Sequence, residues 1–196
     1  MKRVMGYVLI GLLAYVGFLL ATFPAERALV LLKTQAPAQT QAQLKSLRAS
    51  GLAGSVWSGQ AAVLEYQGQR IDKVHWQLKP WSMVTGSLAL DLQLKGKEVA
   101  GNAELHLSPD GSIQMSDVDL RLPGDRASSL LNLPVDLGGL FSVKLDEAQL
   151  QGNKLQSITG ELTWQRAAVI KPVAQSLGEY HAVLSSDDKG VQAQVK

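Results

Sequence analysis

The sequence of 196 residues contains no cysteine, only three histidines and almost no net charge. Without cysteine the chain has no disulfide, no thiol nucleophile and no thiolate metal site. The absence of cysteine also does not tell whether the protein lies in an oxidising or a reducing compartment. The formal net charge is +2, and apart from Lys2 and Arg3 the chain has 17 basic and 17 acidic side chains. Nucleic acid is therefore not an expected partner, because its binding normally requires clustered Lys and Arg.

The sequence also lacks a recognisable reactive constellation. His75, His106 and His181 fall on the polar faces of predicted strands, and none lies at ligand spacing from another histidine or from a carboxylate pair. Asp117 and Asp119 share one side of a strand, where a solvated edge explains them better than a cation site. We therefore predict no enzyme activity, no catalytic, cofactor-binding or metal-binding residues, and no cofactor.

One long stretch of the chain has no charged residue. Val4 to Phe23 comprises 20 uncharged residues, which as a helix span roughly the 30 Å hydrocarbon core of a bilayer. Lys2 and Arg3 precede it, so the positive-inside rule places the N-terminus in the cytoplasm. A cleaved signal peptide is the alternative, but the run exceeds the usual length of about 7–15 apolar residues and lacks a small-x-small site. We predict that residues 1–24 form a cytoplasmic tip and an uncleaved transmembrane α-helix.

Composition divides the rest of the chain into a short connector and one domain. Residues 25–43 are expected to form a juxtamembrane segment and spacer. The sequence up to Lys33 favours an amphipathic helix along the bilayer surface, and Thr34 to Gln43 is small and polar. From about Leu44 the hydrophobic pattern changes to a period of two, which is typical of strands. Residues 44–196 are therefore predicted to form one β-domain.

Alternating apolar and polar residues predict half-buried antiparallel strands in this domain. Turn sequences rich in glycine, proline, asparagine and aspartate separate the strands at hairpin distances. The side chains expected to share one apolar face, as a candidate groove or core, are Val74, Trp76, Leu78, Leu88, Leu90, Leu92, Leu94, Leu105, Leu107, Leu162 and Trp164.

Helical patterns are almost missing from the β-domain. Only Gly124 to Pro134 reads as a helix, and its barely two turns are too short to cover the apolar face. Leaving that face in water would cost more than a domain's net stability, because each buried Leu or Val contributes roughly 1.5–3 kcal/mol. The sheet must therefore curl into a partly open barrel or a trough, or meet something apolar from outside. Shifts of phase near Ser116–Asp117 and between Leu145 and Ala148 predict β-bulges, which increase curvature.

Tryptophan is the most conspicuous residue type in these aliphatic strands. The four tryptophans are Trp57, Trp76, Trp81 and Trp164. They are either a platform for carbohydrate or lipid or, as we favour, buried anchors of their strands.

Several segments in a fixed order resemble a known family. A charged start and an apolar run are followed by GSVWSGQA, VHWQLKPWSMVTGSLALDLQL, DVDLRLP, LLNLPVDLGGLFSVKL, GELTWQRAAV and LGEYHAVL. This order resembles the protein N family of the type II secretion system of Gram-negative bacteria, most closely at Trp57 to Gly59, Leu78 to Gly86 and Gly160 to Trp164. The resemblance implies a single-pass inner-membrane protein with a periplasmic all-β domain, an accessory part of the machinery that exports folded proteins, and no catalytic residues.

The C-terminal end departs from the family pattern. Family members continue for several strands after the equivalent of GVQAQVK, whereas this chain ends at Lys196 within an alternating run. We expect a C-terminal truncation of the β-domain. The alternative is an exposed edge strand that is available for pairing.

Two functions remain open from the sequence. The favoured one is a non-enzymatic scaffold whose sheet edges or polar face contact other type II secretion components. The alternative is a periplasmic lipid-binding or lipid-transfer module. A scaffold predicts an interior filled with side chains, whereas a lipid module predicts a continuous apolar groove.

Overall fold

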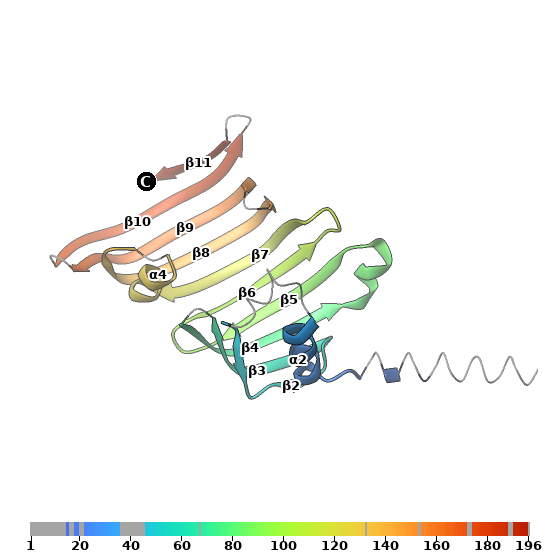
Figure 1. Ribbon diagram of the computed structural model, residues 1–196. Coiled ribbons are helices and arrows are strands. Elements are labelled where there is room, and N and C mark those ends of the chain that lie inside the picture. Colours follow the sequence, from blue (N-terminus) through green and yellow to red (C-terminus); the bar gives the residue numbers. More distant parts are fainter. Residues whose placement is uncertain are drawn as a thin grey trace, which may run out of the picture.

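The computed structural model contains one antiparallel β-sheet of eleven strands (Figure 1). It describes residues 15, 18–19, 22–35, 46–66, 68–131, 133–152, 154–171, 174–187 and 190–195. The strands are β1 (Arg48–Ser50), β2 (Ala53–Gly54), β3 (Ser58–Tyr66), β4 (Gln69–Lys79), β5 (Leu88–Lys95), β6 (Ala100–Leu107), β7 (Ser112–Pro123), β8 (Asp136–Gln151), β9 (Lys154–Lys171), β10 (Gln175–Asp187) and β11 (Gly190–Val195). From β3 onward each strand pairs with the next along the chain, so the sheet is a meander.

The hairpin turns lie where the turn sequences predict them. Gly68, Gly111 and Gly152 adopt φ values of +81°, +80° and +59° at three of these turns, a conformation that glycine reaches without steric cost. In the β6–β7 turn, the backbone N–H and the hydroxyl of Ser112 donate to Asp110 Oδ1 at 2.9 and 2.7 Å. These hydrogen bonds favour the carboxylate and lower the pKa of Asp110.

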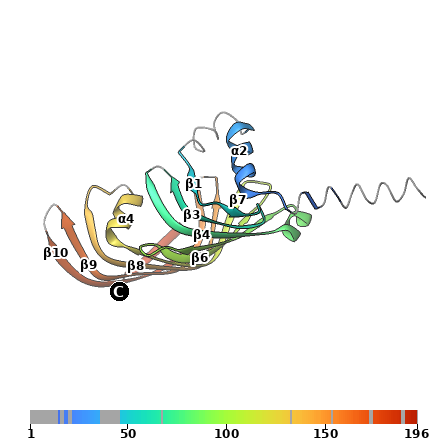
Figure 2. The same cartoon turned by 90° about the horizontal axis from the view of Figure 1, so that it is seen from below.

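The sheet is curved into an open trough and does not close. In Figure 2 the row of strands runs across the view from β10 to β3, and the strands bend upward, with α4 (Gly124–Leu130) on the concave side. The predicted curled antiparallel sheet is therefore confirmed, and the trough is the form that it takes. The predicted short helix also lies where its sequence places it.

Two lines of bulges bend the long strands. At the first, Asp117 has φ +50° and the β6–β7 register shifts between Asn102 and Glu104, and the β8–β9 register shifts between Leu145 and Glu147. These are the two bulges predicted from the phase of the hydrophobic pattern. At the second line, which the pattern did not reveal, Gly139, Arg166 and Gly178 have φ values of +86°, +50° and +98°. An extra residue on one strand increases its bend, and repetition on adjacent strands curves the whole sheet.

The helix α4 covers one end of the trough. Ala127 packs with Val99 and Leu122 in a small buried cluster, against which Leu94, Leu120 and Phe141 are partly buried. Ser128 fastens the helix to β8, because its hydroxyl oxygen accepts a hydrogen bond from the backbone N–H of Leu137 at 2.9 Å. One short helix therefore shields only a part of the apolar face, as its length predicts.

The N-terminal region joins the sheet at its β2–β3 end. The helix α2 (Ala25–Gln35) occupies the predicted juxtamembrane segment, and just before it the carbonyl oxygen of Phe23 accepts a hydrogen bond from Val56 N–H at 3.0 Å. The predicted anchor, Val4 to Phe23, lies mostly outside the described residues. Within the part of the chain that the structure describes, no helix has the length and apolar character needed to span a membrane.

Candidate functional site

The predicted apolar residues line the concave face of the trough. The helix α4 lies on the concave side and packs there against Leu94 and Leu122, which identifies this face. Strand pairing arranges the residues in rows across the sheet. One row comprises Leu78, Leu90, Leu105, Met115, Ala148 and Ile158, and another comprises Val74, Leu94, Gly101, Leu120, Val143, Leu162 and Ala182. Trp76 pairs with Leu92, Leu88 with Leu107, and Trp164 with Phe141.

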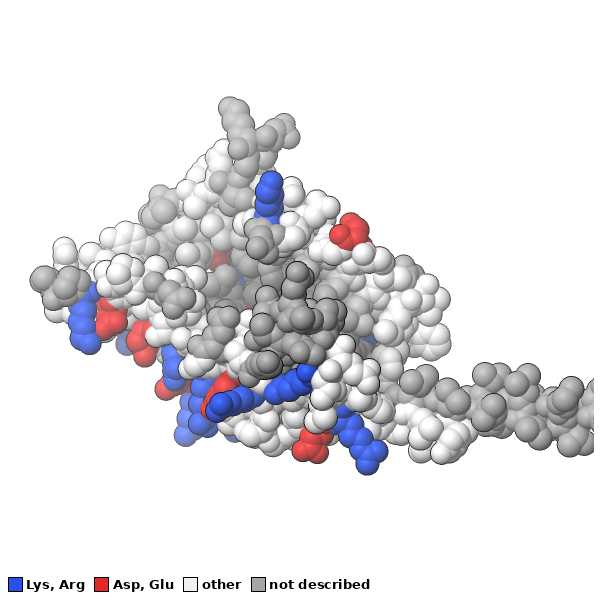
Figure 3. Space-filling view, viewed as in Figure 1, with Lys and Arg blue, Asp and Glu red and all other residues white. Residues whose placement is uncertain are grey.

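The trough is lined with apolar side chains but is not filled by them. Of the predicted face only Val74 is buried, and the other ten residues are partly exposed. Among the described residues no large side chain is less than 2% exposed. Figure 3, viewed from the same side as Figure 1, shows charged side chains gathered mainly along one margin of the molecule. The described floor of the trough is therefore formed by rows of apolar side chains that stay in partial contact with water.

Three aromatic rings meet at the β8–β10 end of the trough. Phe141, Trp164 and Tyr180 lie opposite one another on β8, β9 and β10, with ring centroids 4.9 Å apart for the first pair and 6.0 Å for the second. Together with Leu162 and Ala182 they line a pocket of about 230 Å³. The sequence did not bring Phe141 and Tyr180 into the predicted site, although both occupy apolar positions of alternating segments.

The tryptophans follow the predicted role of strand anchors only in part. The indole N–H of Trp76 donates to the carbonyl oxygen of Val56 at 3.1 Å, and that of Trp164 donates to the carbonyl oxygen of Gly138 at 2.8 Å. These bonds fix both rings against the sheet. Trp81 contradicts the prediction, because it lies on the 3₁₀ helix η1 (Pro80–Thr85) and is 84% exposed. Its strand ends at Lys79, so Trp81 has no sheet face to pack on.

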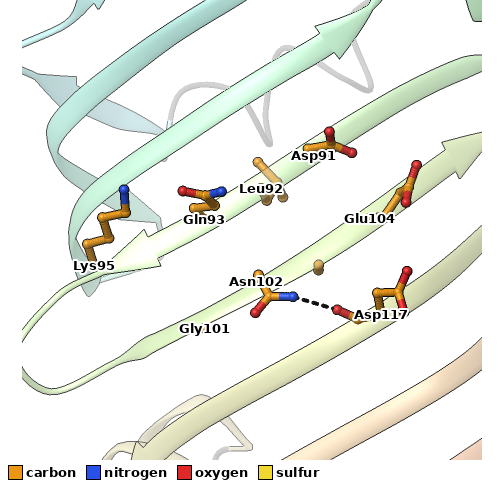
Figure 4. A pocket seen from close by; sticks show the side chains of 9 residues that line it. Asp91, Leu92, Gln93, Lys95, Gly101, Asn102, Glu104 and Asp117 are labelled. Carbon is orange, nitrogen blue, oxygen red and sulfur yellow. Dashed lines mark hydrogen bonds between the residues drawn. The ribbon is translucent and has the colours of Figure 1, made fainter.

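The convex face carries the polar side chains that alternate with the leucines. Asp91, Asn102 and Glu104 border a shallow hollow of about 510 Å³ (Figure 4). Lys79 donates a hydrogen bond to Glu104, and its Nζ lies 3.0 Å from Asp91 Oδ1. The bond to Glu104 and the neighbouring Asp91 raise the pKa of Lys79, and the bond from Lys79 lowers the pKa of Glu104. Because these groups pair with one another and are partly solvated, they form a surface ion network of small energy.

The histidines do not form a reactive cluster. His106 Nε2 lies 3.2 Å from Glu104 Oε1, and His181 Nδ1 lies 3.2 Å from Thr163 Oγ1, while His75 Nδ1 is a buried atom for which the described residues provide no hydrogen-bond partner. Within the described ranges, no three His, Asp or Glu side chains are grouped closely enough to hold a metal ion. The main interaction that the described sheet can make with a ligand is therefore apolar contact in the trough.

Comparisons with known proteins agree on one family. Residues 45–196 match the family model described as type II secretion system protein N. A protein of Aeromonas hydrophila named type II secretion system protein N is 28% identical over 191 residues, which cover 94% of this chain and 72% of that protein. A protein of the same name from Vibrio cholerae serotype O1 is 28% identical over 183 residues, which cover 88% of this chain and 67% of that protein. No solved structure matches the chain.

Proposed function

Because the chain belongs to the family of type II secretion system protein N, we propose that it serves type II secretion as an accessory component without enzymatic activity. In this proposal residues 1–24 anchor the chain in the inner membrane, with the N-terminus in the cytoplasm and the β-domain in the periplasm. The uncharged run from Val4 to Phe23, behind Lys2 and Arg3, supports the anchor and its orientation.

Within that role, the β-domain binds lipid through the open trough. The observation that carries this function is the apolar floor of the trough, where ten of the predicted residues stay in partial contact with water instead of being fully buried. A large contiguous apolar surface on a protein usually marks an interaction site, because removing it from water contributes about 25 cal/mol per Å². An acyl chain would cover this surface without bringing a polar group that needs a partner.

The direction of the trough supports the same function. The strands curve around an axis that crosses them, so the trough extends from β3 toward β11 (Figures 1 and 2). Phe23, at the end of the proposed anchor, is hydrogen-bonded to Val56 immediately before β3. One end of the trough therefore lies beside the point where the chain would leave the bilayer. An acyl chain that enters there could leave the membrane while remaining on an apolar surface.

Mass spectrometry of the full chain tests lipid binding directly. We expect chain that has been delipidated in mild detergent to take up phospholipid from vesicles of phosphatidylethanolamine and phosphatidylglycerol, and to retain it through gel filtration. The physical reason is the partly exposed apolar floor, which keeps some contact with water after folding. A chain that emerges free of phospholipid after this treatment contradicts a lipid-binding function.

A scaffold is the second candidate function, and the open form of the sheet supports it. Among the described residues the sheet has β1 as an edge strand, and pairing with a sheet edge is a common mode of protein recognition. The convex face adds polar and charged side chains that suit contacts with other secretion components.

Photo-crosslinking in cells tests the scaffold. We expect a photo-reactive residue at Lys73 or at Asp91 to capture another type II secretion component, because Asp91 lies on the polar face and Lys73 is exposed. The same photo-reactive residue at Leu92 serves as the control, since it projects into the trough from the neighbouring position of β5. Capture of no protein at either polar position counts against the scaffold.

A further inference from the structure

We propose that the pocket of Phe141, Leu162, Trp164, Tyr180 and Ala182 is a fixed binding site for one phospholipid acyl chain. This inference rests on the proposed lipid-binding function and places one of the two acyl chains of a phospholipid at the β8–β10 end of the trough, which leaves the rest of the floor, including Leu92, to the other chain. The pocket is formed by three neighbouring strands, β8, β9 and β10, and lies on the same apolar face as the predicted leucines.

The lining of the pocket is uncharged and its aromatic rings are held in place. Phe141 and Trp164 stack at an interplanar angle of 14°. The indole N–H, the polar atom of Trp164, is bonded to the Gly138 carbonyl oxygen at 2.8 Å, so its hydrogen-bonding capacity is already used. What the residues offer a ligand is therefore almost entirely hydrocarbon surface. A neutral hydrocarbon chain complements a lining without charge, whereas a charged headgroup would lose its hydration there.

The size of the pocket and the pairing of its strands favour an acyl chain over a peptide. Its volume of about 230 Å³ lies below the range of about 300–1,000 Å³ that is usual for pockets of drug-sized ligands, so it accommodates a segment of a slim unbranched chain and not a bulkier ligand. The floor belongs to β9, which pairs with β8 on one side and with β10 on the other. A peptide backbone in this pocket would find few hydrogen-bond partners in the floor and would lose those it has in water. An acyl chain has no such groups.

Tryptophan fluorescence can locate the chain, because the protein contains a matched control. We would compare two full-length variants that each retain one tryptophan, Trp164 or Trp81, with phenylalanine at the other three positions and folding checked by circular dichroism. The probe is a vesicle of phosphatidylethanolamine and phosphatidylglycerol in which the acyl chains carry bromine, a contact quencher. We expect loss of the Trp164 emission and retention of the Trp81 emission, although Trp81 is the more exposed ring, at 84%.

The outcomes separate this site from the proposed function. Uptake of phospholipid by mass spectrometry with equal quenching of Trp81 and Trp164 overturns the site and leaves lipid binding intact. Absence of both uptake and quenching removes the site and the function together.

A second measurement covers the case in which the variants with one tryptophan fail to fold. The unaltered full chain is irradiated with a phospholipid that carries a diazirine in its acyl chain. We expect the label on peptides from β8, β9 and β10, and label confined to other strands overturns the site.

Discussion

Leu92→Asp is expected to weaken phospholipid binding roughly fiftyfold while leaving the β-domain folded. Leu92 lies between Trp76 and Ala103 on the floor of the trough, where a carboxylate keeps its hydration and forces an acyl chain away. If about three methylene groups lose their contact at about 0.8 kcal/mol each, binding weakens by about 2.4 kcal/mol. Because about 1.4 kcal/mol corresponds to a tenfold change in affinity, this loss is roughly fiftyfold. Titration of the delipidated chain with vesicles measures this change.

Gln93→Asp is the matched control for Leu92→Asp. It introduces the same charge one residue later on β5, on the opposite face, where Gln93 is exposed. Phospholipid binding should be unchanged in this variant, and lipid held by the proposed anchor is common to both variants. Equal binding by the two variants, or unfolding of Leu92→Asp as if it had entered a filled core, contradicts the open trough as the binding surface.

Gly160→Ala is expected to destabilise the β-domain by about 3 kcal/mol, the upper part of the usual range for overpacking. A Cβ atom at Gly160 would overlap the backbone carbonyl oxygen of Lys144 on β8, and it would lie 2.8 Å from the Cα of Leu145. Relief of this overlap requires β8 and β9 to separate beside the bulge, because the obstacle is backbone rather than a flexible side chain. At roughly 2–4 °C for each kcal/mol in a domain of this size, the midpoint of thermal unfolding should fall by about 6–12 °C.

Gly152→Ala separates close packing from backbone conformation. Gly152 lies in the turn that joins the same two strands, with φ +59°, and a Cβ atom added there would meet no heavy atom within 4 Å beyond its immediate chain neighbours. Its replacement should cost only the strain of the left-handed conformation, about 1–2 kcal/mol. Similar losses of stability in the two variants, measured by denaturant unfolding, contradict the close approach of β8 and β9 at Gly160.

The period of the sequence predicted which side chains share a face. Val74, Trp76 and Leu78 alternate with polar residues, and a strand sends successive side chains to opposite sides whatever its neighbours are. The bulge at Asp117 was predictable for the same reason, because a shift of phase within one strand requires an extra residue there.

The aromatic pocket was not predictable in this way. Phe141, Trp164 and Tyr180 are far apart along the chain, and they meet only because β8, β9 and β10 pair in one particular register. The second line of bulges was also not predictable. Around Gly139, Arg166 and Gly178 the sequence has no regular alternation of apolar and polar residues, so an extra residue there leaves no visible shift of phase.

The amino-acid sequence by itself determined the order of the hairpins, the apolar face and the scarcity of helix, since each follows from interactions between residues near one another along the chain. Only the tertiary structure decided that the sheet stays open and that its leucines line a trough instead of filling a core. Closure depends on the sum of bends and registers over many strands, and the covering of the face depends on where the short helix α4 comes to lie. Both the closure of the sheet and the covering of its apolar face depend on residues far apart along the chain, so the hydrophobic period of a single strand cannot predict them.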